Sequence, residues 1–83
     1  MDTSFSITDF TSACILRASG IPLLRLDMGN NRIICFVFDS TPTNCEQILK
    51  QHWDRNLNLE SRLLFEVISE LKTRIHQLLS RKP

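Results

Sequence analysis

The stretch of this sequence that decides the fold is residues 32–39, RIICFVFD, in which six apolar residues follow one another from Ile33 to Phe38. A strand with one face in water alternates apolar and polar residues, whereas an uninterrupted apolar run predicts that both faces are covered. A chain of 83 residues has room for one domain with a single core of modest size. The central question is therefore what covers the second face of this strand.

The preceding segment, residues 22–28 (PLLRLDM), is the expected partner strand of a β-hairpin. Gly29, Asn30 and Asn31 lie between the two strands, and these residue types tolerate the positive φ of a tight two-residue turn. Such a turn gathers aliphatic side chains on one face, the expected core: Leu24, Leu26, Met28, Ile33, Cys35 and Val37. The other face would carry Leu23, Arg25, Asp27, Ile34, Phe36 and Phe38. A three-residue loop would exchange the partners, because a slip of one residue moves every side chain to the opposite face.

Three helices are expected beside this hairpin. The first is bracketed by an N-cap at Thr8 or Asp9 and by Gly20 in the position of a left-handed C-cap. The second has Thr43 and Glu46 at its start, with the spacing of a capping box. The third runs from about residue 59 to about residue 81. Its apolar seam has the 4-3-4-3 spacing of a coiled coil and consists of Leu64, Ile68, Leu71, Ile75 and Leu78.

These elements predict an α+β fold with the order α-β-β-α-α. In this fold a two-stranded antiparallel hairpin packs against three helices, and the C-terminal helix is long. Residues 1–83 would form a single domain, with residues 1–6 flexible and residues 82–83 frayed. A two-stranded hairpin is not stable alone, so the second and third helices are expected to cover its aliphatic face.

The face that carries Phe36 and Phe38 has two possible covers, namely the first helix of the same chain or another molecule. A second copy is a natural candidate, because the hairpin has two free edges and the third helix carries a seam. The predicted protein interface consists of Phe36, Phe38, Ile34, Arg25, Ile75 and Leu78. The expected partner is therefore another protein or a second copy of the chain, which would form a homodimer.

Charge is distributed unevenly along the chain, although the net charge is only +1. Residues 1–71 hold six basic and nine acidic side chains, whereas residues 72–83 hold four basic side chains and no acidic one. The basic side chains either complement the dipole of the last helix or bind phosphate or an acidic partner. The candidate nucleic-acid-binding residues are Lys72, Arg74, Arg81 and Lys82. Arg25 and Arg32 on the hairpin would extend this patch, with Asp27 partly neutralising them.

Little in the sequence favours catalysis, a metal or a cofactor. The chain has two glycines, and neither lies in a phosphate-binding pattern. His52 and His76 fall on predicted helices, outside any triad arrangement. Cys14, Cys35 and Cys45 form no CxxC pair and lie on faces assigned to the core. We therefore expect a non-enzymatic, reduced, cytoplasmic protein with no cofactor, no catalytic or metal site and no membrane partner.

Five segments together resemble a known family. They are a helix ending in ILRASG, a leucine-rich strand, the strand RIICFVFD, the break HWDRN and the helix LFEVISELKTRIH. The combination resembles a family of small prokaryotic and phage domains of unknown function, over residues 7 to about 77. That family has no agreed activity. The resemblance implies an accessory role in the nucleic-acid transactions of a mobile or phage-like element.

Two functions are compatible with these observations. The leading hypothesis is a small non-enzymatic protein-interaction module, dimeric or docked on a larger protein, that is accessory to nucleic-acid machinery. The alternative is a protein that binds DNA or RNA directly through the basic end of its C-terminal helix. The two differ in whether phosphate is contacted by this chain or by its partner.

Overall fold

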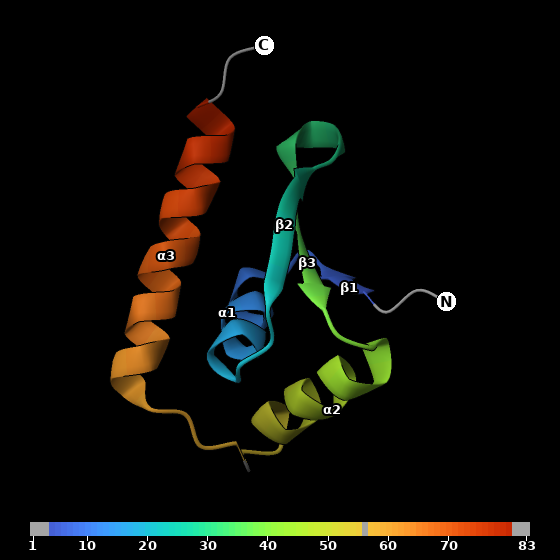
Figure 1. Ribbon diagram of the computed structural model, residues 1–83, viewed down its shortest axis with the longest axis vertical. Helices are drawn as coiled ribbons and strands as arrows, with labels where there is room; N and C mark the ends of the chain where they lie inside the picture. The colour runs from blue at the N-terminus through green and yellow to red at the C-terminus, as the bar shows by residue number, and fades with distance from the viewer. Residues whose placement is uncertain (1–3, 56, 81–83) are drawn as a thin grey trace.

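The computed structural model describes residues 4–55 and 57–80 and has a mixed α+β architecture (Figure 1). The elements are β1 (Ser4–Ile7), α1 (Phe10–Ala18), β2 (Leu23–Met28), a 3-10 turn (Asn30–Arg32), β3 (Ile34–Asp39), α2 (Pro42–Trp53) and α3 (Ser61–Ser80). The expected class and the three helices are confirmed. The sheet, however, has three antiparallel strands in the order β1-β3-β2, so the expected two-stranded hairpin is corrected. The order of elements is β-α-β-β-α-α.

The additional strand, β1, lies in the segment expected to be flexible. Its sequence SFSI alternates polar and apolar residues, and Phe5 and Ile7 pack against the core. β1 pairs with β3 so that Phe5 faces Phe38 and Ile7 faces Phe36. Residues 4–6 of the segment expected to be flexible therefore belong to a paired strand. Residues 1–3 and 82–83 lie outside the part of the chain that is described.

The pairing of β2 with β3 also differs from the expected register. Leu26 faces Phe36 and Met28 faces Ile34, and the Gly29 N–H donates to the Ile33 carbonyl at 2.7 Å. The turn between the strands therefore holds three residues, Asn30–Arg32, instead of two. Two of these residues have left-handed backbone, at φ 60° and 59° for positions 31 and 32.

This change of register exchanges the two faces of the hairpin. Phe36 and Phe38 point toward α1, and Leu23 and Leu26 pack against the same core. The expected aliphatic core face is therefore correct for Leu26 but wrong for Leu24, which lies at a bulge in β2 and is 51% exposed. Because β3 is the central strand, both of its edges are paired.

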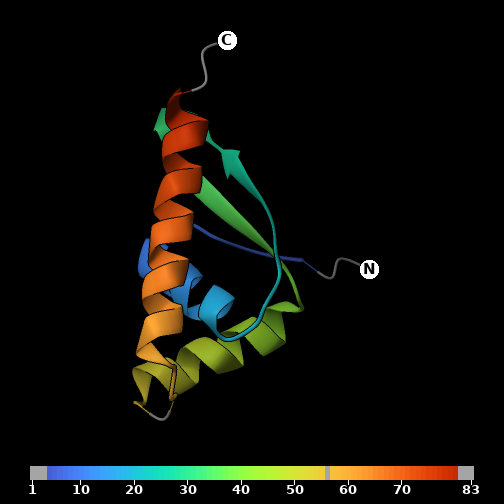
Figure 2. The same ribbon diagram turned by 60° about the vertical axis from the view of Figure 1, so that its left-hand side comes forward.

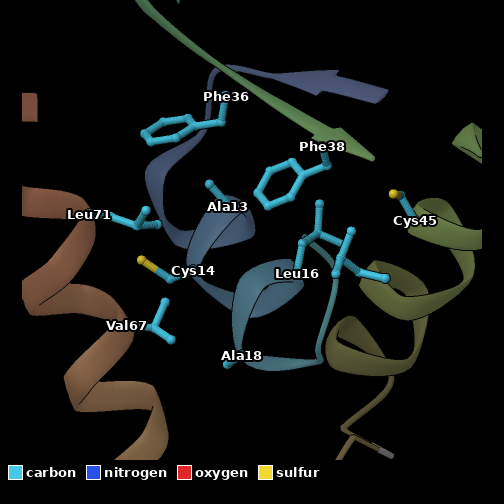
Figure 3. Close-up of a cluster of buried hydrophobic side chains, with 10 residues drawn as sticks. Ala13, Cys14, Leu16, Ala18, Phe36, Phe38, Cys45, Val67 and Leu71 are labelled. Carbon is cyan, nitrogen blue, oxygen red and sulfur yellow. The ribbon is translucent and has the colours of Figure 1, made fainter. Parts of the chain in front are cut away.

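The core forms where α1 meets the sheet, α2 and α3 (Figure 3). Phe36 and Phe38 are 1% and 0% exposed, and their rings lie against the α1 side chains Ala13 and Leu16. The first helix of the same chain therefore covers this face. The prediction that Phe36 and Phe38 form an exposed protein interface is wrong, because both side chains are buried within a single copy. Ile34 is half-buried and packs against the same core.

The opposite face of the sheet buries little of the apolar run. Val37 is the residue of the apolar run that is buried there, at 2% exposed, between its neighbours Ser6 and Arg25 on the flanking strands. Cys35 is half-buried and Ile33 is 52% exposed in the turn. The apolar run thus contributes one layer of core side chains, and its other side chains are shielded by neighbouring strands or left partly in water.

Helix α1 begins and ends as its sequence predicts. Asp9 is the N-cap, and its carboxylate accepts from the Ser12 N–H at 2.9 Å and from the Ser12 hydroxyl at 2.7 Å. At the other end, the Gly20 N–H donates to the Arg17 carbonyl and the Ile21 N–H to the Leu16 carbonyl, the two bonds of a Schellman motif. Gly20 has a φ of 96°. These two caps fix the residues at which α1 begins and ends.

Helix α2 is capped by Thr41, whose hydroxyl accepts from the Asn44 N–H, so the expected capping box at Thr43 is corrected.

The apolar seam of helix α3 packs against the core of the same chain. Leu71 is fully buried, and Leu64, Ile68 and Ile75 pack against the core. Figure 2 shows α3 running from the α2 end of the molecule to the hairpin turn. A hollow lies on each flank of its C-terminal half.

Candidate functional site

The first groove lies between the start of α1 and the C-terminal half of α3. Its larger hollow, of about 420 Å³, is lined by Phe10, Lys72, Ile75, His76 and Leu79. A smaller hollow, of about 100 Å³, is lined by Phe10, Thr11, Cys14, Ile15, Leu64 and Ile68. Both hollows share Phe10, so we treat them as one feature, the α1–α3 groove.

The α1–α3 groove is apolar inside and carries positive charge at its rim. Lys72 and His76 line the larger hollow, and none of the described residues that line either hollow is acidic. Phe65 precedes Lys72 by seven positions, which places it on the same flank of α3, and it is 70% exposed. The flank therefore combines exposed apolar surface with basic and imidazole groups.

Cys14 lies beneath this groove. Burial raises the pKa of the Cys14 thiol, the positive charge of Lys72 opposes that rise, and Asp9 adds to it. A thiol with a raised pKa carries little thiolate, so Cys14 is a poor nucleophile. Its side chain serves as part of the apolar floor.

The second groove lies on the other flank, between α3 and β2, and we call it the α3–β2 groove. It has a volume of about 190 Å³ and is lined by Arg25, Leu26, Arg74, Gln77 and Leu78. Arg25 also pairs with Asp27, with Nε 3.1 Å from both carboxylate oxygens. Two arginines that are far apart in the sequence thus line one groove, and one of them pairs with a carboxylate.

A third arginine joins this end of the molecule. Arg32, on the hairpin turn, donates from Nη2 to the carbonyl of Leu79 at 3.2 Å. We call Arg25, Arg32 and Arg74 the basic tip. In both Figure 1 and Figure 2 the hairpin turn lies beside the C-terminal end of α3. Arg81 and Lys82, which were predicted to bind nucleic acid, lie outside the described residues.

The structure divides the residues that the sequence had grouped. Lys72 and Arg74 are two positions apart on α3, so they lie on opposite flanks and line different grooves. Ile75 and Leu78, both predicted as interface residues, are divided in the same way. Arg25, predicted as an interface residue, lies instead in the basic tip with Arg74.

Sequence reasoning missed the contribution of Phe10. It marks the start of α1, and its ring centroid lies 6.3 Å from that of Phe36. Phe10 is half-buried, and it lines the larger hollow together with Leu79.

Other candidate chemistry is dispersed. Among residues 4–55 and 57–80, no group of three histidine, cysteine or acidic side chains is placed to hold a metal ion. His52 packs against the ring of Trp53, with centroids 5.1 Å apart. Burial raises the pKa of the Cys45 thiol, while a hydrogen bond with Ser40 opposes this rise. The two α3 grooves are therefore the features that could bind a ligand.

Comparison with known proteins does not assign this chain to a family. A scan against protein-family models gave no match, and searches of curated proteins and of solved structures found no significant match. None of the described helices combines the length and the apolar character that crossing a bilayer requires. Function is therefore argued from the two grooves.

Proposed function

We propose that this protein is a small non-enzymatic interaction module that docks on a partner protein through the α1–α3 groove. The observation that carries the proposal is an apolar groove with a hollow of about 420 Å³ beside a phenylalanine that is 70% exposed. Apolar surface left in water is worth roughly 25 cal/mol per Å² when a partner covers it. Pockets that accept a partner's apolar side chains are where binding energy concentrates.

The same proposal includes an accessory role in nucleic-acid machinery. The basic tip lies at the end of α3, and the α1–α3 groove follows the same helix. A partner held in the groove would therefore bring the tip close to any nucleic acid that the partner binds. The resemblance to small prokaryotic and phage domains favours this setting.

Site-specific photo-crosslinking tests the docking surface. A photoreactive phenylalanine analogue is introduced at Leu79, in the groove, and separately at Leu63, which is 41% exposed and lies about 160° away around α3. The proposal expects one defined protein adduct in the native cells from position 79 and none from position 63. Equal adducts from both positions, or none from position 79, would contradict it.

A second candidate, direct binding of DNA or RNA, is favoured by the basic tip. Arg25 and Arg74 line one groove with a glutamine, and Arg32 lies at the same end of α3. Guanidinium groups suit phosphate because they donate two parallel hydrogen bonds. Each phosphate contacted makes affinity fall with salt, with a logarithmic slope of about −0.7 to −0.9.

Fluorescence anisotropy with labelled single-stranded DNA, duplex DNA and RNA tests this second candidate. Direct binding predicts an affinity that weakens with salt and is lost in the double variant Arg25→Glu/Arg74→Glu. The matched control is Arg62→Glu, an arginine on the same helix whose side chain is 85% exposed at the opposite end. Equal loss in the control, or binding that does not depend on salt, would exclude the basic tip.

A further inference from the structure

Lys72, the cation that lines the α1–α3 groove, has no acidic side chain on its own flank of α3. Lys72 and His76 line the larger hollow. Glu66 and Glu70 lie about 120° and 160° away from Lys72 around the helix axis, given 100° per residue. Glu66 is within 3.5 Å of Arg62, with which it forms an i,i+4 pair. The groove thus presents uncompensated positive charge beside apolar surface.

The acidic side chain at the start of α1 has a structural role. Asp9 precedes Phe10, and its carboxylate accepts both hydrogen bonds from Ser12 and caps the helix. Among the described residues Lys72 forms no salt bridge, so a carboxylate of the molecule that fills the groove can pair with it. Charge complementarity of this kind sets partner choice and association rate.

We infer that the α1–α3 groove receives an acidic amphipathic helix of a partner protein. This inference rests on the proposed docking function and names the chemistry of the partner. Its apolar side chains would enter the two hollows on either side of Phe10. Its carboxylates would face Lys72 and His76.

The dimensions of the groove suit a helix. The α3 residues that line it span positions 64 to 79, which is about 22 Å of helix at 1.5 Å per residue. A partner helix of about four turns covers that length, with apolar residues spaced i, i+3 or i+4, and i+7. The larger hollow of about 420 Å³ would accept the bulkiest of these side chains, and the smaller hollow of about 100 Å³ a smaller one.

A second copy of the chain fits this groove less well. In a two-fold symmetric dimer the same patch meets itself. The patch would then bring Lys72 of one copy toward Lys72 of the other, with no acidic side chain among the described lining residues of either copy's groove. Like charges brought together in this way oppose association.

Two synthetic peptides test the inference on the purified full-length protein. Both carry leucine and phenylalanine at the same i, i+3/i+4, i+7 positions, and one has glutamate where the other has lysine. Anisotropy of the labelled peptides should show the acidic peptide binding at least about tenfold more tightly. Lys72→Glu should reverse this preference. Lys50→Glu, at an exposed position on α2, should leave it unchanged.

The remaining outcomes each overturn the inference. Equal binding of the two peptides, or a preference that Lys72→Glu does not alter, would exclude charge recognition. Failure of both peptides to bind would exclude an amphipathic helix as the occupant, while crosslinking at position 79 still decides independently whether the groove docks a protein. Light scattering that gives twice 9.6 kDa, and a monomer for Phe65→Glu, would identify a second copy instead.

Discussion

Arg32 donates a hydrogen bond to the carbonyl of Leu79, a residue 47 positions further along the chain, at 3.2 Å. The carbonyl belongs to the last turn of α3, where carbonyl groups have no partner within the helix. The guanidinium also places a positive charge at the negative end of the helix dipole. One side chain therefore ties the hairpin turn to the end of α3 and holds the basic tip together.

Replacing Arg32 with alanine should lower the free energy of unfolding by about 0.5–1.5 kcal/mol, the range for one lost hydrogen bond together with its favourable charge. Urea denaturation measures this change. Arg62→Ala, which removes a partner of a surface ion pair on α3, should change the free energy of unfolding by less than about 0.5 kcal/mol. If both variants behave alike, the Arg32 contact does not stabilise the end of α3.

Truncating the phenylalanines of β3 should destabilise the fold without affecting an interface. Phe36→Ala or Phe38→Ala removes a ring that is at most 1% exposed, which typically costs about 3–5 kcal/mol. The matched control is Phe65→Ala, at a side chain that is 70% exposed, with an expected change of about 0.5 kcal/mol or less. Thermal melting monitored by circular dichroism distinguishes them. Little loss of stability in the β3 variants would contradict the observed core.

The three helices and the caps of α1 could be predicted from the sequence because they depend on residues close together in the chain. Asp9 caps α1 through Ser12, three positions away, and Gly20 closes it through Arg17. The pairing of the strands depends on contacts between residues that are far apart in the sequence. β1 is a four-residue strand whose pairing partner Phe38 lies 33 positions from Phe5, and no local pattern specifies that contact.

The predicted register of β2 with β3 was wrong for a different reason. The sequence allowed a turn of two or three residues, and the observed turn includes Arg32 with left-handed backbone, which this residue type does not favour. The candidate site was predicted only in part. Arg74 was identified from charge, but its proximity to Arg25 depends on how α3 docks beside β2, which helical spacing alone does not reveal.

Gly20 should be intolerant of substitution even though space is available. A Cβ at this position would meet nothing within 4 Å, so a steric clash is absent. Its φ of 96°, however, is a conformation that residues with a side chain rarely adopt. Gly20→Ala should therefore lower the free energy of unfolding by about 1–2 kcal/mol, measured by urea denaturation. An unchanged denaturation midpoint would show that α1 can end without the left-handed cap.

The three cysteines should differ in reactivity. None is in a disulfide, and Cys35 is half-buried, whereas Cys14 and Cys45 are 2% and 0% exposed. Burial also raises the pKa of Cys14 and Cys45, which reduces the reactive thiolate. Iodoacetamide at neutral pH should therefore modify Cys35 first, as read by peptide mass spectrometry, and all three at similar rates in denaturant. Modification of either buried cysteine as fast as Cys35 in the folded protein would contradict this order.

The Asp9 cap should make stability depend on acid. Hydrogen bonds from the Ser12 hydroxyl and N–H lower the pKa of Asp9 below its ordinary value of 3.8. Since the folded pKa lies below the unfolded one, the ionised carboxylate stabilises the fold above pH 3.8, and this contribution is lost as pH falls through the folded pKa. Asp9→Asn retains a good N-cap that cannot ionise. Relative to Asp9→Asn, the wild type should therefore lose free energy of unfolding as pH falls below 3.8. Urea denaturation of both proteins at a series of pH values measures this difference. A difference that stays constant over that range would show that the Asp9 charge does not contribute to the cap.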